Sequence, residues 1–187
     1  MRNFFRVLAL GSTACLVSAV SVATVTAQQG SSGDAVERGR YLVTITGCHD
    51  CHSPKKVGMT PDLDRGLSGR PSTTALPSKT DGEVHASLDL TAWTGPWGQS
   101  VASNLTPDPA TGLGSRYTEA TFIATMRTGK KPNGLALLPP MPSDVYQNMT
   151  DGDLKAIFAY LRSLKPVRNA VMAGIAPPPP APAGAKK

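Results

Sequence analysis

The sequence predicts an all-α fold, and three observations predict it. Three segments carry apolar residues at helical spacing between recognisable start and stop signals. No segment alternates apolar and polar residues convincingly, as a half-buried strand would. The long middle of the chain, residues 54–115, is rich in Gly, Pro, Ser, Thr and Asp, which is typical of loops. We therefore expect a helical domain that carries a long loop-rich insertion.

The first helix is predicted from about Asp34 to Ile45. Asp34 is a candidate N-cap, because a carboxylate can accept hydrogen bonds from the free N–H groups of the first turn. Val36 and Tyr41 supply the apolar side of this helix, with Leu42 and Ile45 as further members. The helix leads directly into the only pair of cysteines outside the N-terminal segment.

The second helix is predicted from about Thr118 to Arg127. Thr118 can cap its first turn, and Gly129 ends it because glycine tolerates the backbone conformation found after a helix C-terminus. Three apolar side chains are expected to form its buried stripe: Phe122, Ile123 and Met126.

The third helix is predicted from about Thr150 to Leu164, and Pro166 stops it. Thr150 with Asp153 resembles a capping box in which Asp replaces the usual Glu. The expected core positions recur at helical spacing: Leu154, Ile157, Phe158 and Leu161.

Residues 1–27 are typical of a secretory signal peptide. Arg2 and Arg6 give a positive start, an apolar stretch follows, and residues 25–27 (Val-Thr-Ala) form a small-residue cleavage pattern. Interspersed Ser and Thr make the stretch weakly hydrophobic and no stop-transfer charges follow, so we expect cleavage rather than a retained membrane anchor. Cleavage would also remove Cys15, the third cysteine of the chain.

The remainder is expected to form one domain. Residues 28–33 are predicted to be a flexible linker and residues 34–169 the domain, in which residues 62–103 are the insertion. Residues 170–187 are rich in Pro and Ala, cannot bury a core and are expected to be a disordered tail.

The charge excludes a nucleic-acid binder. The formal net charge is +6, but Arg2 and Arg6 belong to the leader and Lys186 and Lys187 to the tail, which leaves +2 for the domain. That value is far from the basic face that nucleic acid requires.

The central motif is the run Cys48-His49-Asp50-Cys51-His52. A C-x-x-C-H sequence is typical of c-type haem attachment, in which both cysteine sulfurs add to the porphyrin vinyl groups. A short helical turn presents Cys48 and Cys51 to one porphyrin edge. His52 then lies under the ring, where an imidazole nitrogen can bind the iron. We expect His49 to point away from the metal.

Other interpretations of the cysteine pair fit less well. A zinc site would need two more ligands at similar spacing. A thioredoxin-like redox pair would precede a helix in a βαβ setting, which the sequence lacks. A disulfide between residues three apart would constrain little.

A second axial ligand is predicted at Met141. It lies in a stiff apolar segment, Leu137 to Pro142, whose three prolines fix φ near −65°. Such a loop can hold a thioether on iron and exclude water, and methionine is the usual second ligand of electron carriers. The other candidates are Met59, Met126, Met149, Met172, His49 and His85.

These segments resemble a single-haem class I c-type cytochrome of the bacterial periplasm. Gly39-Arg40-Tyr41 before the motif is similar to the family's first helix, and Pro140-Met141-Pro142 followed by residues 153–161 to its axial-methionine loop and closing helix. Residues 104–108 (Asn-Leu-Thr-Pro-Asp) and 117–122 resemble segments of cytochrome subunits that partner periplasmic dehydrogenases. The insertion departs from the compact family pattern.

The resemblance implies several structural details. The first and last helices should cross at a glycine and aromatic residues, for which Gly39, Tyr41 and Tyr160 match. A backbone carbonyl should orient the ring of His52, and Pro61 is the candidate by position.

The insertion and the surface lysines carry further expectations. Trp93, Trp97, Leu88 and Leu90 are expected to face inward, and the Trp97 indole N–H could reach a haem propionate, although a packing role is favoured. Four lysines, Lys55, Lys56, Lys130 and Lys131, are expected to form a positive docking surface near the haem edge.

The function expected from the sequence is periplasmic electron transfer by one covalent haem c with His52 and Met141 as axial ligands, and not enzymatic catalysis. Expected partners are redox proteins, either a periplasmic dehydrogenase or a terminal oxidase or membrane complex. Two alternatives stay open: a haem enzyme or gas sensor with an open sixth position, and a fixed electron-transfer subunit of a dehydrogenase complex.

Overall fold

The computed structural model describes residues 32–57, 59–78 and 81–172. The predicted leader, most of the predicted linker and most of the predicted tail lie outside these residues. The described elements, in chain order, are α1 (Ser32–Ile45), α2 (Cys48–His52), a 3₁₀ turn (Leu63–Arg65), β1 (His85–Ala86), β2 (Ala92–Gly95), β3 (Gly98–Val101), α3 (Glu119–Thr128), α4 (Ser143–Tyr146) and α5 (Asp151–Ser163). No helix in the described part is both long and apolar enough to cross a membrane.

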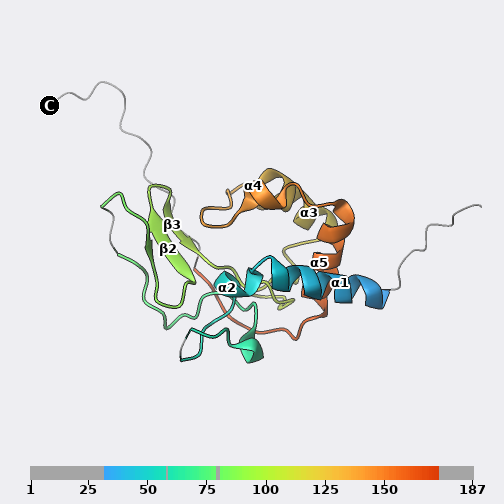
Figure 1. The fold of residues 1–187 in the computed structure, drawn as a ribbon, viewed down its shortest axis with the longest axis horizontal. Helices are drawn as coiled ribbons and strands as arrows, with labels where there is room; N and C mark the ends of the chain where they lie inside the picture. Colours follow the sequence, from blue (N-terminus) through green and yellow to red (C-terminus); the bar gives the residue numbers. More distant parts are fainter. Residues whose placement is uncertain (1–31, 58, 79–80, 173–187) are drawn as a thin grey trace, which may run out of the picture.

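The helices and the strands occupy opposite ends of the molecule. In Figure 1, α1, α3 and α5 lie at one end, the hairpin of β2 and β3 lies at the other, and α2 lies between them. The helices share one apolar cluster of buried side chains, to which the loops contribute Leu67 and Leu113. The chain therefore places the cysteine motif at the junction between a packed helical half and a loop-rich half.

The crossing of α1 and α5 depends on the absence of a side chain at Gly39. A Cβ there would lie 1.9 Å from the Ala156 carbonyl oxygen and 2.7 Å from the Tyr160 Cβ, so only glycine allows this approach. The crossing at Gly39 and Tyr160 confirms the expectation from the resemblance. Tyr41 does not take part, because 52% of it is exposed.

The buried face of α1 agrees with the predicted apolar side at Leu42 but otherwise differs from it. Gly39, Leu42 and Val43 are buried, which is the i, i+3, i+4 pattern of one helix face. Ile45, expected on the apolar side, is 58% exposed. Asp34 lies in the first turn and is not the cap, because the helix begins at Ser32 and takes in the end of the predicted linker.

The caps of α3 were predicted correctly. The Thr118 hydroxyl accepts the Thr121 N–H, and the Thr121 hydroxyl accepts the Thr118 N–H in return. Gly129 follows α3 with φ 66°, a left-handed conformation that glycine adopts without strain. Of the predicted stripe, Phe122 and Met126 are buried and Ile123 packs partly buried against the core.

Only one of the two hydrogen bonds of the predicted capping box forms at the start of α5. The Thr150 hydroxyl accepts the Asp153 N–H, but the Asp153 carboxylate bonds the Arg38 guanidinium of α1 at 2.9 and 3.0 Å instead of returning to the cap. This ion pair ties the first and last helices together. All four predicted core residues of α5 are buried: Leu154, Ile157, Phe158 and Leu161.

The insertion contains a small sheet that the sequence did not reveal. Its three antiparallel strands lie in the order β1-β2-β3, with Ala92 opposite Val101 and Gly95 opposite Gly98. The strands are two to four residues long, so no alternating pattern develops.

Two of the four residues expected to face inward from the insertion do not. Leu88 is 92% exposed and Leu90 is 41% exposed, because both lie in the turn between β1 and β2. Trp93 and Trp97 are partly buried, in agreement with the expectation.

Candidate functional site

The two cysteines of the motif lie on one turn of α2. Gly47 starts this helix with φ 70°, and a Cβ there would lie 2.8 Å from a carboxylate oxygen of Asp50. Both cysteines are free, and burial raises the pKa of each thiol, so both stay neutral. Cys48 packs partly buried against the core cluster. Helix α2 thus presents two thiols that form no disulfide, three positions apart on one turn, as attachment of a flat prosthetic group requires.

His52 is held by a hydrogen bond that decides its tautomer. Its Nδ1 lies 2.8 Å from the Ser103 carbonyl oxygen. A carbonyl can only accept, so Nδ1 carries the proton and Nε2 keeps its lone pair. Among the described residues, no hydrogen bond reaches Nε2. Burial lowers the pKa of His52 and the Ser103 bond opposes this, so the ring is a neutral imidazole that can bind a metal.

The prediction that Pro61 orients this ring is wrong. Pro61 instead faces Lys55 in an isolated antiparallel bridge. Ser103 takes the role because two backbone hydrogen bonds bring its segment to α2: the Gly69 N–H donates to the His52 carbonyl at 2.7 Å, and the Arg70 N–H donates to the Ala102 carbonyl at 3.0 Å. A residue 51 positions further along the chain therefore fixes the histidine, and no local sequence signal announces it.

Met141 lies partly buried against the same core cluster as Cys48. Its N–H donates to the Leu138 carbonyl at 3.2 Å, and its own carbonyl accepts the Ser143 N–H at 2.9 Å, at the start of α4. These bonds fold the proline-rich loop into a tight turn. The structure therefore places the predicted thioether residue partly buried at the edge of the helical core.

The other methionines offered as ligands have different surroundings. Met126 is buried within α3 and Met149 packs against the core from the segment before α5. Met59 and Met172 are 45% and 60% exposed.

The other two histidines are engaged by neighbouring side chains. The Nδ1 of His49 lies 2.8 Å from the Ser53 hydroxyl, and the Nε2 of His85 lies 2.6 Å from an Asp81 carboxylate oxygen. Both partners are within four residues of the histidine, so these bonds are local. His52 differs from them because a distant backbone carbonyl orients its ring.

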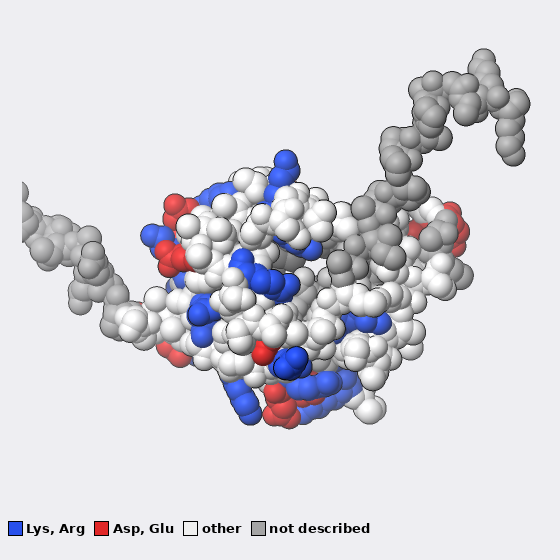
Figure 2. Space-filling model, turned by 180° about the vertical axis from the view of Figure 1, so that it is seen from behind, with Lys and Arg blue, Asp and Glu red and all other residues white. Residues whose placement is uncertain are grey.

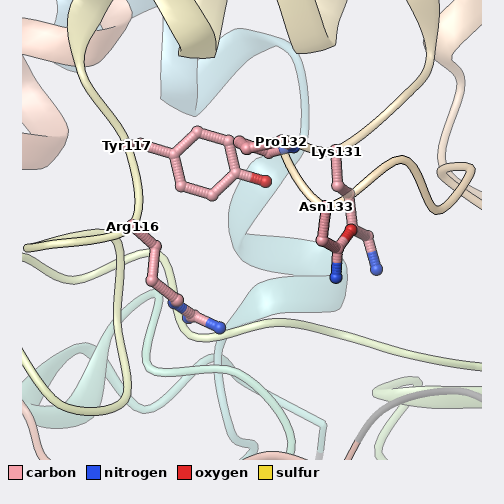
Figure 3. A pocket seen from close by; sticks show the side chains of 5 residues that line it. All are labelled: Arg116, Tyr117, Lys131, Pro132 and Asn133. Carbon is pink, nitrogen blue, oxygen red and sulfur yellow. The ribbon is translucent and has the colours of Figure 1, made fainter.

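A cavity of about 370 Å³ opens between the segment before α3 and the loop after it. Figure 3 shows Arg116 and Tyr117 on one side and Lys131, Pro132 and Asn133 on the other. Lys131 is close enough to contribute to the lowered pKa of His52. The cavity therefore lies in the neighbourhood of the motif, although the four predicted site residues do not line it.

The chain is similar in sequence to several known proteins. The chain is 32% identical over 136 residues to the gluconate 2-dehydrogenase cytochrome c subunit of Pantoea cypripedii, and 31% identical over 134 residues to the fructose dehydrogenase cytochrome subunit of Gluconobacter japonicus. It is 26% identical over 157 residues to the cytochrome c subunit of a quinone-type alcohol dehydrogenase from Gluconobacter oxydans. No family model matches the chain. The chain is related to the cytochrome c subunits of dehydrogenases.

This relationship covers most of the chain but little of each relative. The matches span 72%, 71% and 81% of this chain, against 24%, 22% and 27% of the relatives' own length. The chain therefore spans about a quarter of the length of these relatives. A relationship to cytochrome c subunits confirms the resemblance drawn from the motif and implies haem c as the cofactor.

The residues present fit such a group. A c-type haem uses two cysteine thiols for attachment, and an imidazole and a methionine thioether are iron ligands of this class of cofactor. Arg70 is only 5% exposed, and its Nε has no hydrogen-bond partner among the described residues. A buried guanidinium requires an anionic partner, and a haem propionate is a carboxylate.

Basic side chains gather where the face opposite to that of Figure 1 is hollowed. Figure 2 shows this hollow near the centre of the view, with Lys and Arg side chains at its edge. Lys131 belongs to the cavity, and burial and Arg116 lower its pKa. The cavity near the motif therefore carries two basic side chains, Arg116 and Lys131.

The expected four-lysine docking surface is not a single patch of free cations. The Lys55 ammonium donates to three backbone carbonyls, those of His49, Asp50 and Ser53, at the end of α2. Lys56 pairs with two carboxylates, those of Asp62 and Asp64. Both lysines therefore support local structure, and Lys130 is the exposed member that remains.

Proposed function

We propose that this chain is a periplasmic electron-transfer protein that carries one covalent haem c, bound through Cys48 and Cys51 and ligated by His52 and Met141. It would transfer electrons without transforming a substrate. The names of the relatives support a dehydrogenase as the electron donor. The signal-peptide pattern of residues 1–27 supports export to the periplasm, where haem c is attached.

The observation that carries this proposal is the orientation of His52. A histidine next to a C-x-x-C pair could be an ordinary surface residue. Here its Nδ1–H is bound to the Ser103 carbonyl and its Nε2 is left with a free lone pair. Metal-ligating histidines almost always donate their other ring N–H in this way, because the bond fixes both tautomer and ring orientation.

The electron balance is simple. Bound haem c supplies one-electron exchange between Fe(III) and Fe(II): one electron arrives from a reduced donor, one leaves for an oxidised acceptor, and no atom is transferred. The chain's own residues hold the cofactor. Cys48 and Cys51 would fix it covalently, His52 and Met141 would ligate the iron, and the apolar cluster would exclude water. With both ligands in place, no site on the iron would remain for a substrate.

The decisive experiment replaces Met141 by alanine. We expect covalent haem to remain, because the thioether bonds and His52 are untouched. The reduction potential should fall by on the order of 0.1 V, a fraction of the roughly 0.8 V that axial ligands span, because a neutral thioether favours Fe(II). Carbon monoxide should then bind the reduced protein readily.

The matched control is Met59→Leu, which changes an exposed methionine close to the motif and should alter neither property. If Met141→Ala leaves the optical spectrum and the potential unchanged, Met141 is not the ligand. If acid–acetone extraction removes haem from the denatured wild-type protein, the thioether attachment is wrong.

A further inference from the structure

The hairpin of β2 and β3 is joined to the loop that carries Met141. The Ser100 hydroxyl donates to the Pro139 carbonyl at 2.5 Å, across 39 positions of sequence. Ser100 lies in β3 and is only 8% exposed. Pro139 precedes Met141 by two residues, so this bond anchors the loop next to the thioether.

The local sequence of the hairpin fixes the donor. Pro96 and Trp97 form its two-residue turn between Gly95 and Gly98, which lie opposite each other. A Cβ on Gly95 would lie 2.7 Å from the Trp97 ring, so the glycine lets the ring fold back over the strand. The indole N–H then donates to the Ser100 hydroxyl oxygen at 3.3 Å.

These bonds form a relay with a defined direction. An indole N–H can only donate and a carbonyl can only accept, so the Ser100 hydroxyl accepts from Trp97 and donates to Pro139. Each bond in such a chain polarises the next and strengthens it. Ser100 is buried, whereas Pro139 is exposed, so the bond ties the surface loop before Met141 to a buried donor.

The loop that follows β3 reaches His52, the other proposed ligand. Three residues after Ser100, the Ser103 carbonyl accepts the His52 Nδ1–H at 2.8 Å. The Ala102 carbonyl accepts the Arg70 N–H, and the Gly69 N–H donates to the His52 carbonyl. One short segment, residues 100–103, is thus bonded to His52 at one end and to the Met141 loop at the other.

We propose that the insertion is a brace for both axial ligands, and that Ser100 and Trp97 are positioning residues for Met141. They contact neither iron nor methionine, and act through the Pro139 carbonyl. This inference assigns a role to the loop-rich insertion that distinguishes the chain from a compact cytochrome. It rests on the proposed ligation by Met141.

The test measures how easily an added ligand displaces the methionine. Imidazole binds ferric haem only after the Met141 loop releases the iron, so its apparent affinity reports the open fraction of the loop. Ser100→Ala removes one part-buried hydrogen bond and should raise that affinity about 2- to 10-fold. The methionine–iron absorption band of the oxidised protein should weaken in parallel.

Matched variants separate positioning from general destabilisation. Ser163→Ala removes the same kind of bond, a serine hydroxyl to the Tyr160 carbonyl, at the end of α5, and should leave imidazole affinity unchanged. Ser100→Thr keeps the hydroxyl and should restore the wild-type affinity. Trp97→Phe keeps an aromatic ring but loses the N–H, and should raise the affinity by less than Ser100→Ala does.

The variants distinguish failure of the proposed brace from failure of the proposed Met141 ligation. If Met141→Ala does not open the iron, the ligand assignment fails. If Met141→Ala opens the iron but Ser100→Ala and Trp97→Phe both match Ser163→Ala, the ligand assignment stands and the brace is overturned. If the Ser100→Ala protein does not fold in usable amounts, the imidazole affinity of Trp97→Phe is compared with that of Ser163→Ala. Equal affinities then overturn the brace.

Discussion

Gly39 and Ser103 show how much of this protein is decided by single backbone positions. At Gly39 a missing side chain lets α1 approach the Ala156 carbonyl of α5. At Ser103 a carbonyl oxygen holds the His52 ring, and the serine side chain is not involved. The first position is expected from the sequence through its resemblance to the cytochrome family, whose first and last helices cross at a glycine. The second could not be expected, since every residue has a carbonyl.

Gly39→Ala should therefore destabilise the protein severely. A Cβ 1.9 Å from a backbone oxygen cannot be accommodated by a side-chain rotation, so the helices must separate. Overpacking of this kind costs about 1–3 kcal/mol or more, even after the gain in helix propensity. Chemical denaturation of the haem-loaded protein measures the loss.

The control for this change is Gly152→Ala in the first turn of α5. A Cβ there meets nothing closer than the Thr150 hydroxyl at 3.8 Å, so the change should be neutral or stabilising by up to about 1 kcal/mol. Equal free energies of unfolding for the two variants would show that the helices do not cross as described.

Asp89 lies in the turn between β1 and β2 and holds the start of the hairpin in place. Its carboxylate accepts hydrogen bonds from the hydroxyls of Ser87, Thr91 and Thr74, and from the Thr91 N–H. Burial alone would raise the pKa of Asp89, but these bonds outweigh it and leave the pKa below the ordinary 3.8. The charged form of Asp89 is therefore part of the native hairpin.

Asp89→Asn should lower the stability of the hairpin by about 1 kcal/mol at neutral pH, because one accepting oxygen and the charge are lost. A lowered folded-state pKa means that the stabilisation is complete above pH 3.8 and disappears as the pH falls through the lower folded value. The difference in hairpin stability between the wild type and Asp89→Asn should thus shrink below pH 3.8. Amide exchange of residues 85–101 as a function of pH measures it.

An exposed aspartate provides the comparison. Asp64→Asn removes a surface ion pair with Lys56, which is worth little, and should not change exchange in the hairpin. A stability difference for Asp89→Asn that persists unchanged at low pH would argue against a role for its charge.

The elements differ in how far the sequence predicts them. The helices α3 and α5 agree with the prediction within a residue or so, because their caps and apolar spacing are local signals. The sheet is missed, since it is assembled from strands too short to show a period and held by side chains such as Asp89. The residues of the candidate site also differ in how well the sequence predicts them. Cys48, Cys51 and His52 form one contiguous motif and are predicted, whereas Ser103 and Ser100 come near this motif only through the fold and are not.

The whole molecule is two unequal halves that meet at α2. The helical half has a continuous apolar cluster of its own, which includes the Phe122 and Phe158 rings, 5.3 Å apart. The loop-rich half contributes few side chains to that cluster. Its described contacts with the rest are largely hydrogen bonds: to His52 and Ser53 around α2, and to Pro139 beside Met141. Haem bound between these points would connect both halves.

Removal of haem should therefore unfold the two halves to different extents. We expect the double variant Cys48→Ser with Cys51→Ser, which cannot form thioether bonds, to lose cooperative thermal unfolding. The insertion has no apolar core to keep it folded once His52 and Met141 are released, so residues 62–103 should exchange their amides fastest. Any residual protection should be confined to α1 and α5, whose packing at Gly39 and ion pair between Arg38 and Asp153 need no cofactor. Hydrogen exchange of the haem-loaded and haem-free proteins, followed by mass spectrometry, compares the segments directly. A haem-free form that melts cooperatively with a protected insertion would show that the loops fold without haem.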